Sequence, residues 1–159
     1  MGNGPPTPSD FDVVKELNAH TGRLATALGI AFASGSLSLG NGPIHDALAT
    51  TRTEYWPVYV ALIFYALDLA ASGFFLLNAM EPPLPQNASW KDCINTKQSS
   101  GAVAAYLLLA AFLAIGLAWV LAYVGPLSDW KYLSLALFIP ELFVIGYGLG
   151  ILIGKLNPD

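Results

Sequence analysis

The stretch that decides the fold is WPVYVALIFYALDLAASGFFLLNA, residues 56–79, in which Asp68 is the only charged residue. About 20 consecutive apolar residues in a helix cross the hydrocarbon core of a bilayer, which is roughly 30 Å thick. A second run of this kind covers residues 132–154 and contains Glu141. An ionisable group at the centre of such a helix costs roughly 3 kcal/mol or more on insertion scales. The sequence therefore predicts an integral membrane protein with two energetically unfavourable acids.

The composition agrees with a membrane protein. Of the 159 residues, 55% are hydrophobic and 11% are charged, whereas soluble proteins have roughly 25% charged residues. The net charge of −4 provides no basic surface for nucleic acid. The single cysteine, Cys93, cannot form an internal disulfide, and no His/Cys/Asp group has the spacing of metal ligands. We therefore expect no nucleic-acid partner, no bound metal and no cofactor.

Four segments have the length and composition of transmembrane helices: residues 24–40, 56–79, 101–124 and 132–154. The first is the weakest, because its 17 residues include four hydroxyl side chains. Gly-rich and Pro-rich turns follow the first two segments, so residues 41–55 and 81–100 are expected to be loops. The predicted fold class is all-α, with four transmembrane helices.

A short amphipathic helix is expected at the membrane interface, ahead of the first span. Ser9 or Asp10 can cap it, and apolar residues recur at helical spacing from Phe11 onward. The chain thus divides into residues 1–22, a tail with this helix, and residues 23–159, a four-helix transmembrane domain. With four spans, five of the seven basic residues lie on the side of the two termini, which favours the matrix or cytoplasmic side for both.

Small residues recur at every fourth position on several spans, and such faces let helices approach closely. The first span has two of these stripes, which contain Ala25, Gly29, Ala33 and Ala27, Ala31, Gly35. The third span has Ala110, Ala114, Ala118 and Ala122. The most pronounced stripe is Gly146, Gly150 and Gly154 in the last span. We expect helix packing along these faces, including Gly29 and the three glycines of the last span.

Asp68 and Glu141 each need a proton or a cationic partner, because a low dielectric disfavours the charged form. Tyr65 and Ser72 lie on the same helix face as Asp68 and can hydrogen-bond a carboxyl group. The favoured interpretation is that both acids face protein and are satisfied by these hydroxyls or by a partner subunit. A proton or ion path is the alternative, although the spans around the acids are almost wholly apolar.

No Ser/His/Asp or Cys/His arrangement indicates a catalytic residue, so the sequence does not point to an enzyme. A small tetraspan chain with short loops, small-residue helix faces and a short acidic N-terminal segment, Asp10-Phe11-Asp12, resembles the accessory (supernumerary) membrane-arm subunits of mitochondrial respiratory complex I, of the fungal kind. The resemblance covers the general format of the whole chain.

The resemblance implies a location in the mitochondrial inner membrane, reached by import without cleavage. Its further implications are a non-catalytic role in stabilising or assembling NADH:ubiquinone oxidoreductase, an electron-transport complex of the respiratory chain, and partners among other membrane subunits and lipids. Catalytic, cofactor-binding and metal residues are not implied. The alternative function is a small tetraspan transporter or ligand-binding membrane protein that uses Asp68 and Glu141.

Overall fold

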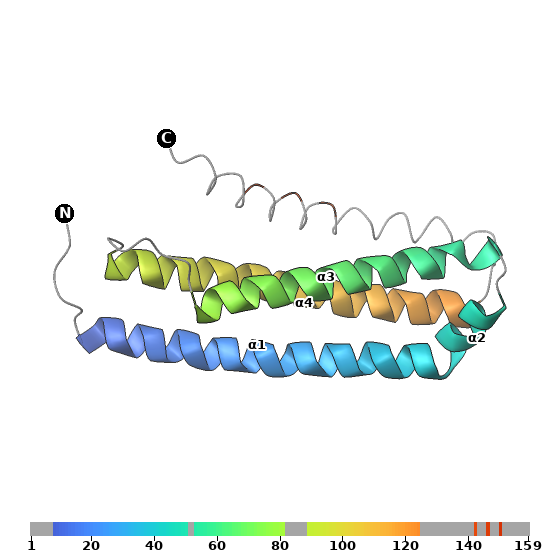
Figure 1. The fold of residues 1–159 in the computed structure, drawn as a ribbon, viewed down its shortest axis with the longest axis horizontal. Helices are drawn as coiled ribbons and strands as arrows, with labels where there is room; N and C mark the ends of the chain where they lie inside the picture. Colours follow the sequence, from blue (N-terminus) through green and yellow to red (C-terminus); the bar gives the residue numbers. More distant parts are fainter. Residues whose placement is uncertain are drawn as a thin grey trace.

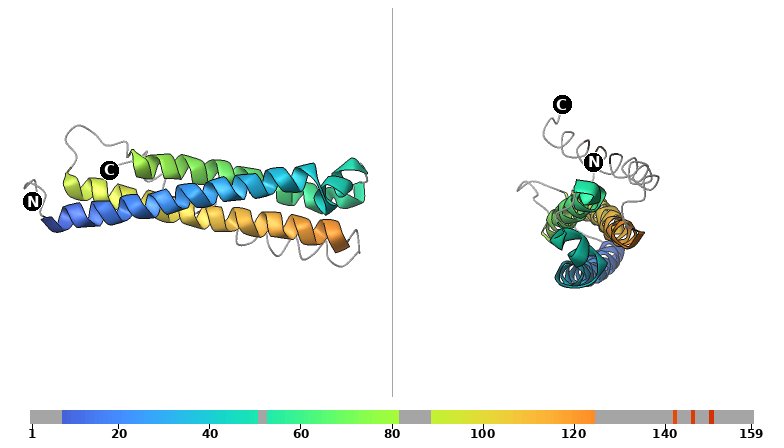
Figure 2. Two further views of the ribbon diagram at one scale, coloured as in Figure 1. Left: turned by 90° about the horizontal axis from the view of Figure 1, so that it is seen from below. Right: turned by 90° about the vertical axis from the view of Figure 1, so that its right-hand side faces the viewer.

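Three long helices lie side by side and make up most of the described chain (Figure 1, Figure 2). The computed structural model describes residues 8–50, 53–81 and 89–124, together with the helical positions Leu142, Gly146 and Gly150. The elements are α1 (Pro8–Gly40), α2 (Pro43–Ala49), the 3-10 turn η1 (Thr53–Tyr55), α3 (Trp56–Met80) and α4 (Trp90–Val124). α3 runs antiparallel to α1 and α4, and α2 lies at the end where α1 leads into α3 (Figure 1).

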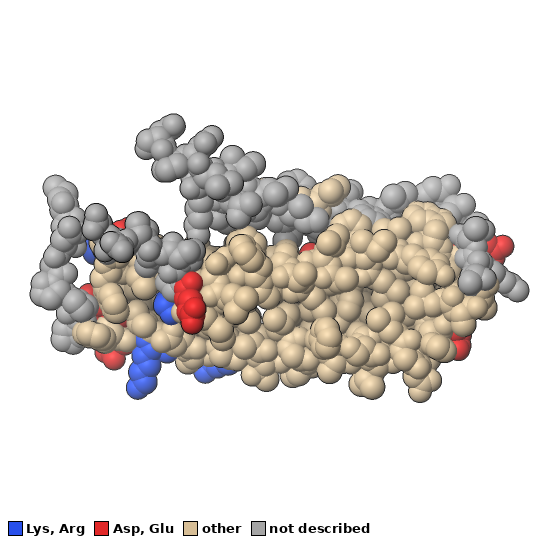
Figure 3. Space-filling model, in the orientation of Figure 1, with Lys and Arg blue, Asp and Glu red and all other residues tan. Residues whose placement is uncertain are grey.

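The all-α prediction is confirmed, but four clear spans are not. α3 and α4 are each long and apolar enough to cross a membrane. α1 meets this test only together with α2, as a pair bent by 50°, so the described chain has two candidate spans, or three if the bent pair crosses as one. The predicted span at 132–154 lies outside the described residues except for three helical positions. Charged side chains gather toward the two ends of the bundle (Figure 3).

α1 is one unbroken helix of 33 residues. The sequence predicts a short interfacial helix followed by a separate first span, but a single helix covers both. Its hydroxyl side chains do not interrupt it, because they donate hydrogen bonds to the carbonyl four residues earlier. Ser34 Oγ bonds Ile30 O at 2.8 Å and Ser38 Oγ bonds Ser34 O at 2.8 Å.

The predicted loop at 41–55 contains α2, which tertiary packing holds in place. Pro43 occupies its first turn, where a proline is tolerated, and Ile44 and Ala47 are buried. Gly42 precedes the helix with φ 87°, a left-handed conformation that favours glycine. A Cβ at Gly42 would also lie 3.3 Å from a ring carbon of Trp119. A seven-residue helix of this kind has too little sequence signal to be predicted.

α4 begins at Trp90, well ahead of the predicted span, so part of the expected loop at 81–100 is helical. Ser89 and Asp92 form a capping box at its start. The Ser89 N–H donates to Asp92 Oδ2 at 2.9 Å, and the Asp92 N–H donates to Ser89 Oγ at 3.3 Å. α1 and α4 extend past the end of α3 on this side (Figure 1), where the rings of Phe11 and Trp90 pack with centroids 5.8 Å apart.

The core is the seam between α3 and α4. Beyond Pro57 in the first turn, the buried positions of α3 recur at spacings of three and four, and they are Val58, Ala61, Tyr65, Asp68, Ser72, Leu76 and Ala79. On α4, the buried positions include a stripe of small residues, Ala104, Ala111, Ala114 and Ala118. Small side chains let the two backbones approach closely. Packing along the alanines of the third span is therefore confirmed at Ala114 and Ala118, which belong to the core.

Candidate functional site

Asp68 is the only charged residue in α3 and lies in the seam with α4, where its side chain is 2% exposed. Its Oδ2 atom is buried and has no hydrogen-bond partner among the described residues. Leaving a buried polar group without a partner costs roughly 1–3 kcal/mol. The sequence-predicted acid is therefore at a deeply buried position, and its carboxyl group is not fully satisfied by the described chain.

The two hydroxyls expected to satisfy Asp68 are directed to other helices. The Tyr65 hydroxyl donates to Ala31 O of α1 at 2.5 Å, and Ser72 Oγ donates to Ala104 O of α4 at 2.9 Å. A hydroxyl has one hydrogen to donate, so neither group donates to the acid. The expectation does not hold for these two side chains, because small residues bring the backbones of α1 and α4 within their reach. Tyr65 and Ser72 instead connect α3 to its two neighbours.

Gly35 makes room for the Tyr65 side chain. A Cβ built at position 35 would overlap the Tyr65 hydroxyl and lie 2.5 Å from two of its ring carbons. Ala31, one turn earlier on α1, is fully buried and accepts the Tyr65 hydrogen bond. The stripe of small residues that includes Ala31 and Gly35 is thus a packing face. The stripe is recognisable in the sequence, but its partner on α3 is not.

The other predicted positions lie apart from this contact. Gly29, Gly146 and Gly150 are exposed, and no atom of another described element lies within 4 Å of a Cβ built at any of them. Glu141 and Gly154 lie outside the described residues. The expected packing of these glycines therefore stays a prediction, and within the part of the chain that the structure describes it has no partner helix.

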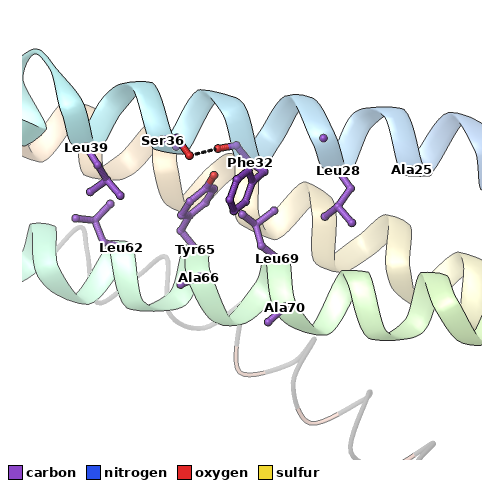
Figure 4. A pocket seen from close by; sticks show the side chains of 12 residues that line it. Ala25, Leu28, Phe32, Ser36, Leu39, Leu62, Tyr65, Ala66, Leu69 and Ala70 are labelled. Carbon is purple, nitrogen blue, oxygen red and sulfur yellow. Dashed lines mark hydrogen bonds between the residues drawn. The ribbon is translucent and has the colours of Figure 1, made fainter.

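A slot of about 680 Å³ lies between α1 and α3, and Gly35 and Tyr65 are among its lining residues (Figure 4). Large side chains project into it from both helices, among them Phe32 and Leu69 (Figure 4). Small residues on the same walls, such as Gly29 and Ala70, leave the remaining space. The slot is not apparent from the sequence alone. The slot forms because both helices carry small residues at similar depths. These residues indicate a slot only once the two helices are known to be neighbours.

Lys97 connects three helices at the end of the bundle where α3 stops. Its Nζ donates to Asn18 Oδ1 of α1 at 3.0 Å and to Met80 O, at the end of α3, at 3.1 Å. The last carbonyl groups of a helix have no partner within that helix, so a lysine in this position stabilises them.

We expect Lys97→Met to lower the free energy of unfolding by about 0.5–1 kcal/mol, because two hydrogen bonds at a solvent-accessible site are lost. The control is Lys91→Met, an exposed lysine near the start of the same helix. Thermal unfolding in detergent, followed by circular dichroism, compares the two variants. Equal midpoints would show that the three-helix contact adds no stability.

The described residues contain no group of three or more His, Cys, Asp or Glu side chains that could hold a metal ion. The distinctive features are the buried acid, the Tyr65–Gly35 contact and the slot between α1 and α3. No family model, curated protein or solved structure matches the chain.

Proposed function

We propose that the protein is a non-catalytic accessory subunit of a multi-subunit membrane complex, which it stabilises through helix packing. The observation that carries this proposal is the outer face of α1, defined by exposed residues that recur at spacings of four and three, namely Thr26, Ile30, Ala33 and Leu37. This spacing is typical of a seam between two packed helices. On α1, the side chains of Ile30 and Leu37 are 57% and 75% exposed, so a partner helix would bury substantial apolar area there.

Protein suits this face better than lipid does. α1 is not apolar enough to pass as a span without α2. Its outer face alternates large residues with the small Thr26 and Ala33, and small or hydroxyl-bearing residues are enriched where membrane helices contact one another. A helix of this composition is best accommodated between other helices, which agrees with a role inside a larger assembly.

We favour the membrane arm of mitochondrial respiratory complex I as this assembly, with both termini on the matrix side of the inner membrane. The first support is the resemblance in format to the accessory subunits of that complex. The second is the distribution of basic residues. The basic residues with described side chains are Lys15, Arg23, Lys91 and Lys97. Basic side chains lie toward the end of the bundle where α1 and α4 begin (Figure 3).

Native gel electrophoresis in mild detergent tests the proposal. We expect the tagged protein to migrate with a large assembly and to copurify with chains of NADH:ubiquinone oxidoreductase. Ala33→Trp should reduce this association, because it places a bulky ring on the outer face of α1. Ala102→Trp, at an exposed position of α4, is the control. A protein that migrates alone or as a small homo-oligomer would overturn the proposal, and copurification with another complex would reject the respiratory assignment.

A small transporter or ligand-binding membrane protein is the second candidate. It is favoured by Asp68 Oδ2, which has no hydrogen-bond partner among the described residues. Acids inside membrane spans often carry protons or bind cations. Protein reconstituted into vesicles should then conduct protons or ions, and Asp68→Asn should abolish the flux without changing the amount of folded protein.

A further inference from the structure

We propose that the slot between α1 and α3 is a binding site for one acyl chain of a membrane lipid. The site does not depend on the accessory role proposed above, because it lies between two helices of this chain. Its walls are formed by α1 from Ala25 to Leu39 and by α3 from Leu62 to Ala70. None of the described residues that line the slot is charged.

The dimensions of the slot fit a hydrocarbon chain and exclude a helix. From Ala25 to Leu39 the slot follows fourteen residue steps of α1, which is about 21 Å at 1.5 Å per residue. A volume of about 680 Å³ over that length gives a mean cross-section of about 32 Å². A helix with its side chains is at least about 10 Å across, which corresponds to about 80 Å². A helix can therefore cover the slot from outside but cannot fill it, whereas an extended acyl chain can lie along it.

The chemistry of the lining matches an uncharged hydrocarbon. Its polar side chains are Ser36 and Tyr65. Ser36 Oγ donates to Phe32 O at 3.0 Å, the bond drawn in Figure 4, and the Tyr65 hydroxyl donates to Ala31 O. Both hydroxyl hydrogens are thus used within the protein. Among the described lining residues, a ligand that carries charge or needs a hydrogen-bond donor finds no complementary group, while an aliphatic chain needs none.

The position of the slot makes acyl chains the available occupant. It lies along the middle of α3, a helix apolar enough to span a membrane, and Phe32 on its wall is 68% exposed. Apolar atoms that face an empty space lose their dispersion contacts, so an unfilled slot is unfavourable. A chain that enters from the surrounding bilayer restores these contacts. It also adds to the contacts between α1 and α3, which include that of Tyr65 with Gly35 and the approach of Leu28 to Gly73.

Photolabelling tests this site on the purified full-length protein in detergent. The probe is phosphatidylcholine with a diazirine in the middle of one acyl chain, added at an equimolar ratio so that bulk lipid does not label every apolar surface. We expect the labelled residues to lie within 25–39 and 62–70, with about tenfold more label there than on the exposed α4 residues Leu109 and Leu113. Even labelling of all exposed apolar faces would overturn the proposal.

Two substitutions narrow the slot, and a matched variant controls for them. Gly29→Leu combined with Ala70→Leu should reduce labelling by about tenfold or more, because the leucines occupy the space of the chain. Gly116→Leu should leave labelling unchanged, since Gly116, like Gly29, is an exposed helical glycine with no atom within 4 Å of its Cβ position. Circular dichroism checks that the variants are folded, and Ala70→Leu alone replaces the double variant if that one is not.

Three further results would contradict the acyl-chain site. The first is unchanged labelling in the folded slot variants. The second is displacement of the label by a sterol but not by unlabelled phosphatidylcholine, which would assign the slot to a rigid ring system. The third is a photoproduct that links α1 or α3 to a second copy of the chain, which would show that protein covers the slot.

Discussion

Gly35→Ala is expected to lower the free energy of unfolding by about 2–4 kcal/mol, an effect opposite to that of most glycine-to-alanine changes in helices. The added methyl group would overlap the Tyr65 hydroxyl and crowd its ring. Tyr65 must then move, which breaks its hydrogen bond to Ala31 O and opens the contact between α1 and α3. Chemical denaturation in a fixed detergent measures the loss.

The control for this change is Gly116→Ala in α4, where a Cβ would meet no side chain and no other helix of the described chain within 4 Å. Alanine is a better helix former than glycine by about 1 kcal/mol, so this variant should be as stable as the unmodified protein or slightly more so. Adding Tyr65→Leu to Gly35→Ala should cost less than the sum of the two single changes, since the smaller side chain no longer meets the methyl group. Equal stability of the Gly35 and Gly116 variants would show that Tyr65 does not pack against Gly35.

Asp68→Val is expected to raise the free energy of unfolding by about 1–3 kcal/mol, because it removes a buried carboxyl group whose Oδ2 has no partner among the described residues. Asp68→Asn keeps a polar group in the same place and should change stability little. The measurement is the unfolding midpoint in detergent, together with the yield of folded protein.

Ser72→Val is the matched control, one turn away on the same buried face of α3. It removes a hydrogen bond that is made, the one to Ala104 O, so it should destabilise by about 1 kcal/mol. Opposite signs for the two valine variants would establish Asp68 as an unsatisfied acid. A loss of stability in Asp68→Val would instead reveal a partner for the carboxyl group, and the acid would then be part of a bonded network.

The apolar runs were the strongest guide to the fold. α3 spans Trp56–Met80, within one residue of the predicted 56–79, because the length and composition of a span are local properties of the sequence. The predicted third span begins later than α4, since residues 90–100 are mostly polar and hydropathy does not detect them. The pattern Ser89-x-x-Asp92 would have indicated the earlier start. α2 could not be predicted, because the burial of Ile44 and Ala47 holds it in place.

The candidate site was predictable in its residues but not in its connections. Hydropathy places Asp68 inside a predicted span. Helical spacing places Tyr65 and Ser72 on the same face of that helix. The acceptors of those two hydroxyls lie 34 and 32 residues away in the sequence, on helices whose registers no local pattern specifies. For the same reason, the stripe through Ala31 and Gly35 was recognisable as a packing face, while the aromatic ring that fills it was not.

The unequal lengths of the helices mean that α4 has two different stabilities along one continuous backbone. Ahead of Lys97, which contacts the end of α3, about 10 Å of α4 has only α1 beside it among the described elements. Its capping box and the contact between Phe11 and Trp90 can open while the rest of the helix stays folded. Amide hydrogens in this first part report local fraying, whereas those beyond Ser100, in the seam with α3, exchange only when the bundle itself comes apart.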